Sequence, residues 1–338
     1  MARFLLKRIL HALPTLAGVS ILAFLLIRLV PGDPVLLMLG ERGGSPEAVA
    51  EMRQNLGLDQ PLAVQYLRFL SHAARGELGQ SIVSKRSVWE EFSARFPATL
   101  ELSAVALAWA VLVGIPVGVV AALNRRRWKD HVLVGMSLVG YSMPIFWWGL
   151  VLILVFSVQL GWTPVAGRIS AMYDVEPWSG FMLLDVWVRG MGWEGFWAAI
   201  RHMLLPALVL GTIPVAAIAR MTRSSLLEVL REDYVRTAKA KGLSFYQIVF
   251  VHALRNALLP VVTVIGLMLG TLLTGAVLTE TLFSWPGVGR WLVNSVQARD
   301  YPVLQGGVLL LAMIIVGVNT FVDVLYTWLN PRLRGRLE

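Results

Sequence analysis

The chain has 338 residues, of which 57% are hydrophobic and only 15% are charged, and its mean hydropathy is +0.67. Because soluble domains carry about 25% charged residues, this composition indicates a protein that lies in a lipid bilayer. The chain contains no cysteine, which excludes disulfides, thiol catalysis and cysteine-ligated metal sites in it.

Six apolar runs are long enough to cross the hydrocarbon core as helices, which takes about 20 residues each. The first run is longer than a signal-peptide core and no small-residue cleavage site follows it, so we expect it to be retained. The sequence therefore predicts an all-α membrane protein with six transmembrane helices. The predicted spans cover residues 9–30, 99–123, 132–157, 203–219, 257–279 and 304–328.

Positive charge predicts the orientation of these spans. With the N-terminus inside, the inner segments hold 17 Lys and Arg against 5 Asp and Glu, whereas the outer segments hold 13 against 14. Because Lys and Arg concentrate on the cytoplasmic side, both termini are predicted to be cytoplasmic. The net charge of +9 needs no nucleic acid to explain it, since the cations are not grouped with base-stacking aromatics on a soluble module.

Two long segments are predicted to lie outside the membrane. Residues 31–95 read as a small helical periplasmic segment, in which Ser45 and Pro46 begin one helix and Gly76 ends another. Residues 158–200 are rich in tryptophan, whose ring suits the boundary between water and lipid.

A basic passage, Asp233 to Pro260, separates the fourth and fifth spans. Gly242 is placed to end one helix, and Ser244 with Gln247 forms a capping box that begins a second helix leading into the fifth span. The sequence thus predicts an elbow of two helices, residues 231–258. It is either a basic surface helix that follows the charge rule or a rigid lever through which a partner tilts the span. The apolar stripe predicted to continue along its first helix comprises Leu227, Leu230, Tyr234 and Ala238.

The elbow resembles the coupling-helix motif of binding-protein-dependent ABC importer permeases. Other stretches are similar to the B-type permeases of the dipeptide/oligopeptide/nickel branch, so the resemblance covers essentially the whole chain; the insert at 158–200 favours the dipeptide permeases within it. One departure is Arg236-Thr237-Ala238 where the wider family has Glu-Ala-Ala, so a docking contact by an acidic side chain at 236 is not implied. The stretches are DYVRTAKAKGL, HALRNALLP, LVPGDPV, ATLELS, GYSMPIFWWG, TETLFSWPGVGRWL and RDYPVLQGGVLL.

The resemblance implies a type I importer transmembrane domain over residues 96–327, preceded by a transmembrane helix at 1–30 and followed by a cytoplasmic tail at 328–338. It implies a bacterial inner-membrane location, a second, similar permease, two cytoplasmic ATPase subunits and a periplasmic peptide-binding protein. The implied cargo is dipeptides or short peptides; nickel, glutathione and haem stay open as alternatives. The residues implied to dock in the ATPase are Arg236, Thr237, Ala238, Lys239, Lys241 and Gly242.

Catalytic and cofactor sites are not expected in this chain. A P-loop needs a Gly-Lys pair to hold phosphates, and the sequence has none, so ATP is expected to bind partner subunits. The five histidines are too scattered to predict a metal site. We therefore expect a transport subunit and not an enzyme.

Two groups of residues are candidates for the translocation path. Tyr141, Ser142 and Met143 precede Pro144, which is expected to kink the third span; they either face a cavity or pack against another helix. Asn319 and Asp323 lie one turn apart in the sixth span, where Asp323 either lines the path or pairs with an arginine at the inner face.

An outer loop containing Trp285, Gly287 and Gly289 either contacts the binding protein or forms a tight turn that Trp285 stabilises. A rival function is a proton-coupled carrier that acts alone, with Glu101 and Asp323 as relays. It is disfavoured because two widely separated acids make a poor relay, and Glu101 can instead cap its helix or pair with Arg95. An intramembrane enzyme is disfavoured too, since the spans offer no pairing of a nucleophile with a base.

Overall fold

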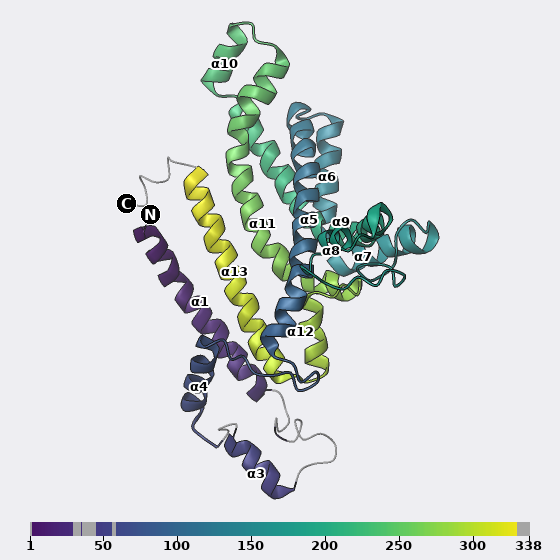
Figure 1. Ribbon diagram of the computed structural model, residues 1–338. Helices are drawn as coiled ribbons and strands as arrows, with labels where there is room; N and C mark the ends of the chain where they lie inside the picture. Colours follow the sequence, from purple (N-terminus) through teal and green to yellow (C-terminus); the bar gives the residue numbers. More distant parts are fainter. Residues whose placement is uncertain (1, 30–34, 36–44, 56–58, 330–338) are drawn as a thin grey trace. The chain divides into compact units, whose positions relative to one another are not determined.

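The computed structural model describes residues 2–29, 35, 45–55 and 59–329 (Figure 1). Within them the fold is helical, and the one β-type contact is an isolated bridge between Gln80 and Ser87. The chain divides into two compact units, one of residues 1–96 with 287–317 and the other of residues 97–286 with 318–338. The predicted division into residues 1–30, 31–95, 96–327 and 328–338 stays a prediction.

The helices are as follows. The first unit holds α1 (Ala2–Leu29), α3 (Pro46–Asn55), α4 (Leu62–Ala74) and α12 (Val288–Gln297). The second holds α6 (Trp128–Ser142), α7 (Ile145–Leu152), η1 (Ile153–Gln159), α8 (Met182–Val188), α9 (Gly192–Val229), α10 (Asp233–Ala240), η2 (Gln247–Ala253) and α11 (Leu254–Leu282). Two long helices, α5 (Val88–Leu123) and α13 (Tyr301–Leu329), have residues in both units.

The described residues of all six predicted apolar runs fall on helices except at Met143 and Pro144 in the third run, which confirms the all-α class. Four helices in the described residues are long and apolar enough to cross a membrane: Val88–Leu123, Gly192–Val229, Gln247–Leu282 and Tyr301–Val322. The first and third runs correspond to the shorter apolar helices Ala12–Leu25 and Ile145–Gln159. Four predicted spans are thus confirmed by length and composition, and the other two stay predictions.

The third run is broken in the middle. Helix α6 ends at Ser142, Met143 takes an extended conformation with ψ of 133°, and Pro144 precedes α7. The proline ring clashes with a helical conformation of the preceding residue, so the helix stops before it. The predicted kink is therefore confirmed, and it divides the run into α6 and the continuous α7–η1 stretch.

In the first unit, the predicted helix boundaries near the N-terminus are confirmed. Helix α3 begins at Pro46, and Gly76 follows the end of α4 with a positive φ of 80°. A core cluster joins the start of α5 to α12 and α13, and there the Trp291 indole donates to Glu91 Oε2 at 2.6 Å. The buried members of this cluster are Val88, Phe92, Val288, Trp291, Val303 and Leu310.

In the second unit, α9 is the central helix and packs against α6, α7, α8 and α11. Its apolar stretch is 67% buried, against 28–39% for the other three candidate spans. Close packing against α5 depends on Gly118, because a Cβ atom there would lie 2.5 Å from the Ala219 carbonyl oxygen. Van der Waals repulsion forbids that distance, so α5 and α9 approach each other only with glycine at this position.

A buried ion pair holds the segment between η1 and α9. Arg168 pairs with Glu101 of α5 and donates to the Gly180 carbonyl at 2.7 Å. Glu101 also accepts backbone N–H groups of Met182 and Leu183 at 3.2 and 2.9 Å.

The predicted pairing of Glu101 with Arg95 is wrong. Arg95 pairs with Glu91 of the first unit, four residues earlier. Residues four apart share one face of a helix, whereas residues six apart, as Arg95 and Glu101 are, do not.

Candidate functional site

Helix α10 is an eight-residue helix between the ends of two long ones, α9 and the α11 stretch that begins with η2 (Figure 1). Helix α9 ends at Val229, and the chain turns through Glu232, whose ψ of 150° is extended. The Arg231 and Glu232 N–H groups donate to the carbonyls of Glu228 and Val229 in this turn. The apolar stripe from Leu227 to Ala238 was predicted to run along one helix; that is wrong, because the turn divides it between α9 and α10.

The end of α10 is fixed by a glycine. Gly242 adopts the predicted positive φ, 77°. Its N–H donates to the Lys239 carbonyl at 3.0 Å and the Leu243 N–H donates to the Ala238 carbonyl at 3.3 Å. This pair of bonds is the Schellman motif, which satisfies the last carbonyls of a helix and stops it sharply.

The predicted capping box after Gly242 is confirmed. The Ser244 N–H donates to Gln247 Oε1 at 3.1 Å, and the Gln247 N–H donates to Ser244 Oγ at 3.4 Å. The chain then continues without a break through the π-helix η2 into α11. Hydrogen bonds among neighbouring residues therefore fix where the first helix of the elbow ends and where the second begins. The second helix leads directly into a candidate span.

Two residues of α10 hold it against η2 and α11. Val235 is fully buried. Tyr234 accepts a hydrogen bond from Asn256 Nδ2 at 2.8 Å and its hydroxyl donates to the His252 carbonyl at 3.5 Å. These contacts cross from α10 to the first turns of the long helix, so α10 is tied to that helix by side chains as well as by the backbone.

The remaining face of α10 is open to a partner. Arg236, Thr237, Lys239, Lys241 and Gly242 are exposed, and Ala238 is half-buried. Arg236 contacts Asp233 one turn earlier, which places an acidic group next to the arginine at position 236. The predicted docking residues thus lie together on α10 and in the two residues that follow it; their docking role stays a prediction.

The helices next to the elbow pack together through an apolar cluster, here called the base of the elbow. At the C-terminal ends of α5 and α9 and along the stretch from η2 into α11, apolar side chains form one cluster around the fully buried Leu226. Its other buried members are Val119, Ala122, Ala253 and Ala257.

Asp130 precedes the third predicted span in the sequence, and its side chain joins α6 to α9. Arg223 Nε donates to its Oδ1 at 2.7 Å and Nη2 donates to its Oδ2 at 2.8 Å, and the Arg126 N–H donates to Oδ2 at 3.0 Å. The Arg223 guanidinium lowers the pKa of Asp130 from 3.8 to about 2. Asp130 is therefore a permanent anion at neutral pH.

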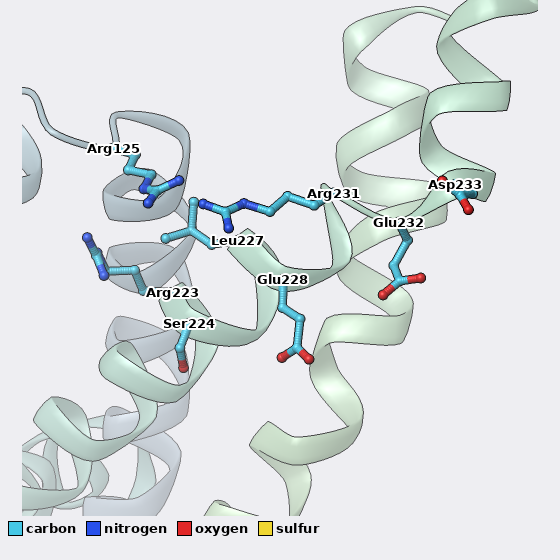
Figure 2. Close-up of a pocket in the computed structure, with 8 residues that line it drawn as sticks. All are labelled: Arg125, Arg223, Ser224, Leu227, Glu228, Arg231, Glu232 and Asp233. Carbon is cyan, nitrogen blue, oxygen red and sulfur yellow. The ribbon is translucent and has the colours of Figure 1, made fainter.

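An open pocket of about 550 Å³ lies between this base and α10 (Figure 2). In Figure 2, Arg231 extends toward Leu227 and Arg125, whereas Glu228 and Glu232 extend away from them. No side-chain ion pair forms at Arg125, Arg231, Glu228 or Glu232 within the part of the chain that the structure describes. A mixed set of unpaired charges around an apolar side chain is suited to contact with another protein. The lining residues are Arg125, Arg223, Ser224, Leu227, Glu228, Arg231, Glu232 and Asp233.

The candidate path residues lie on different elements. Ser142 and Met143 line an open, mostly apolar pocket of about 570 Å³ at the break between α6 and α7. Asn319 lies in α13 against α11, so close that a Cβ atom at Gly270 would be 2.5 Å from its Oδ1. Tyr141 and Asp323 are helical, but their side chains lie outside the described residues. The path role of all five stays a prediction.

The structure buries the residues of the candidate binding-protein loop. In the second unit, Trp285 is fully buried, and its indole donates to the Ala98 carbonyl at 2.9 Å beneath the Arg168 guanidinium. In the first unit, Gly287 and Gly289 are buried at the start of α12. These contacts support the interpretation of a turn stabilised by Trp285; contact with a binding protein stays a prediction.

Sequence reasoning missed the partnership of Asp130 and Arg223. The available signal was an isolated acid after the basic run Arg125 to Lys129. The partner, 93 residues away, could not be identified without the packing of α6 on α9.

Comparison with known proteins agrees with this architecture. The family model "Binding-protein-dependent transport system inner membrane component" matches residues 114–335, and the model "Binding-prot-dependent transport system membrane comp, N-term" matches residues 1–103.

Three relatives are similar over nearly their whole length. The chain is 57% identical to the Di/tripeptide transport system permease protein DppB of Pseudomonas aeruginosa, over 99% of both chains. It is 56% identical to the Dipeptide transport system permease protein DppB of Escherichia coli K12, over 99% of this chain and all of the relative. It is 43% identical to the Glutathione transport system permease protein GsiC of Salmonella paratyphi A, over 99% of both chains.

The matched region contains the whole elbow, its base and the helices that carry it. The chain belongs to the inner-membrane permease components of binding-protein-dependent transport systems.

Proposed function

We propose that this chain is one permease subunit of an ATP-driven importer of dipeptides or short peptides, and that α10 is its coupling helix. The observation that carries the proposal is the fixed attachment of α10. It is stopped by Gly242, held by Tyr234 and Val235, and joined through η2 to the apolar helix α11. A helix attached in this way moves as a unit with the span behind it.

The proposed assembly contains a second permease similar to this one, two cytoplasmic ATPase subunits and a periplasmic peptide-binding protein. The chain lies in a bacterial inner membrane with both termini cytoplasmic, as the excess of Lys and Arg on the segments around the elbow predicts. ATP and Mg²⁺ bind the ATPase subunits, and their energy reaches this chain through contact alone.

The proposed mechanism has one mechanical step in this chain. ATP binding brings the two ATPases together and displaces the α10 helices that sit in them. Tyr234 and Val235 pass the displacement to η2 and α11, and the Asp130–Arg223 pair makes α6 follow α9. Access to the path then alternates between the two sides of the membrane.

The cargo proposal is supported by relatives named for dipeptides and for di- and tripeptides, at 52–57% identity over 99% of this chain. A glutathione importer is the second candidate, since a relative named for glutathione is 43% identical over the same length. Glutathione is itself a short peptide, so the two cargoes share backbone and carboxylate groups.

Uptake into vesicles tests the proposal. Vesicles that hold all the proposed subunits should accumulate labelled dipeptide only with ATP inside and loaded binding protein outside. Glutathione and nickel serve as competitors in the same vesicles. Uptake by this chain alone, or uptake that stops when the proton gradient is collapsed while ATP is maintained, would support a proton-coupled carrier and contradict the proposal.

A further inference from the structure

A tight turn precedes α5 in the first unit. Residues 80–87, here called the outer turn, are closed by the bridge between Gln80 and Ser87. Inside the turn, the Ser81 N–H donates to the Arg86 carbonyl at 2.9 Å and the Lys85 N–H donates to the Ser81 carbonyl at 3.1 Å. Backbone bonds therefore fix its shape.

Asp300, before α13, holds the outer turn in place. The residue is only 2% exposed, and its carboxylate accepts hydrogen bonds from Ser81 Oγ at 2.5 Å and from the backbone N–H groups of Ile82 and Val83 at 3.2 and 3.4 Å. Ser81 Oγ in turn accepts the Ser84 N–H at 2.9 Å. A buried carboxylate satisfied by several donors rigidifies the segment that supplies them.

Two cationic residues beside this contact have a left-handed backbone. Lys85 has φ of 60° and Arg299 has φ of 53°. Glycine or asparagine adopts this conformation more easily than a long side chain does. A lysine and an arginine at these two positions, in place of glycine, therefore favour a role for their side chains.

The outer turn presents cations and apolar groups together. Lys85, Arg86 and Arg299 are exposed, and none of them pairs with a carboxylate within the described part of the chain. Val83 and Val296 beside them are 65% and 59% exposed. Asp300 beside them is buried and already engaged by the outer turn, so the exposed charges of Lys85, Arg86 and Arg299 are positive and lie beside exposed apolar side chains.

We propose that the outer turn with Arg299 is a docking surface for an acidic patch on the soluble binding protein. This inference rests on the proposed function and orientation, which put residues 80–87 outside because they enter α5 at the end opposite residues 124–127. A preorganised turn loses little conformational entropy when a protein docks on it, and its cations attract an acidic partner at long range. Attraction of an anionic lipid headgroup would require only the positive charges and not a fixed turn, so the rigidity of the turn favours a protein partner.

The assembled importer in nanodiscs tests the surface, with the loaded binding protein titrated and ATP hydrolysis measured. Removing two charges by Lys85→Gln with Arg86→Gln should raise the half-maximal concentration of binding protein about three- to tenfold at low salt and less at high salt. The matched control is Arg68→Gln with Arg75→Gln, which removes two exposed cations of α4 and its C-cap and should match the wild type.

Three results would overturn the proposal in distinguishable ways. An unchanged half-maximal concentration in the charge variant, with a stimulated wild type, would contradict the docking surface alone. An effect that disappears in nanodiscs of neutral lipid would show that the cations contact anionic headgroups. A wild-type assembly that binding protein does not stimulate would contradict the proposed function, and this inference with it.

Preorganisation has its own test. Ser81→Ala keeps every cation but removes the hydroxyl that links the outer turn to Asp300. It should raise the half-maximal concentration by a smaller factor than the charge variant and keep its salt dependence. A variant that docks as well as the wild type would show that Asp300 and Ser81 serve the fold only.

Discussion

Arg223 donates two hydrogen bonds to the carboxylate of Asp130, from Nε to Oδ1 at 2.7 Å and from Nη2 to Oδ2 at 2.8 Å. This pair joins α9, which leads into α10, to the first turn of α6. The Arg126 N–H also donates to Asp130, so the loop between α5 and α6 is held by the same carboxylate. The Asp130 carboxylate thus links α6, α9 and the loop after α5, and α9 is the helix that leads into the proposed coupling helix.

Asp130→Asn should weaken this base. An amide cannot accept both guanidinium bonds and carries no charge, so we expect the free energy of unfolding to fall by about 1–3 kcal/mol. Unfolding of the purified protein in detergent measures it. Asp174→Asn, at an exposed acid with no ion pair in the described residues, is the control and should leave stability unchanged; equal losses in both variants would contradict the role given to Asp130.

Acid should remove the same contribution. The pKa of Asp130 is lowered in the folded state from 3.8 to about 2. The stabilisation is therefore complete above about pH 4 and is lost as the pH falls through about 2, because the unfolded state takes up the proton first. Stability curves of wild type and Asp130→Asn should converge over this range, and curves that stay parallel would count against the assignment.

Gly242→Val should disrupt docking through the backbone. A Cβ at Gly242 meets nothing within 4 Å, so the cost comes only from its φ of 77° and is about 1–2 kcal/mol or more for a β-branched residue. We expect less ATPase to co-purify with the chain while membrane insertion is normal. Gly135→Val, in α6 with an ordinary φ and open space, is the matched control.

The pocket beside α10 should respond to charge reversal. Arg125→Glu with Arg231→Glu converts the basic wall of Figure 2 into an acidic one. If the ATPase contacts this wall, its affinity should fall about two- to tenfold, and most at low salt. Pull-down of the ATPase at two salt concentrations measures the effect, and affinity equal to that of the wild type would restrict docking to α10 itself.

Glu101→Ala should loosen the segment from residue 160 to residue 190. Removing one partner of a buried ion pair costs about 3–5 kcal/mol, because Arg168 keeps its charge without a counterion. Limited proteolysis should cut this segment faster, whereas Glu91→Ala, which breaks contacts with Arg95 and Trp291 within the first unit, should not affect it. Unchanged cleavage would mean that other contacts hold the segment.

The features that the sequence predicted correctly are local ones. Gly242, the Ser244–Gln247 box and the stop before Pro144 depend on a few adjacent residues, so their physics can be written down from the sequence. The four confirmed spans follow from composition in the same way. The attachment of the elbow to a long apolar helix followed from its position in the chain.

The features that the sequence predicted wrongly, or did not reveal, depend on packing between elements. The stripe from Leu227 to Ala238 kept a helical period across a turn, so periodicity could not reveal the break at Glu232. Glu101 lies 67 residues from Arg168, and nothing in either neighbourhood marks them as partners. Long-range ion pairs of this kind depend on which segments pack against each other, and a single sequence does not show that packing.

Site-specific cross-linking tests the central claim most directly. The chain contains no cysteine, so Lys239→Cys gives a unique reactive group on the exposed face of α10, and Arg68→Cys on α4 gives the control. In the assembled complex, α10 is predicted to cross-link to an ATPase subunit, with a yield that changes when ATP is added, and α4 is predicted not to. A complete, active complex in which Lys239→Cys never reaches an ATPase subunit would contradict the account.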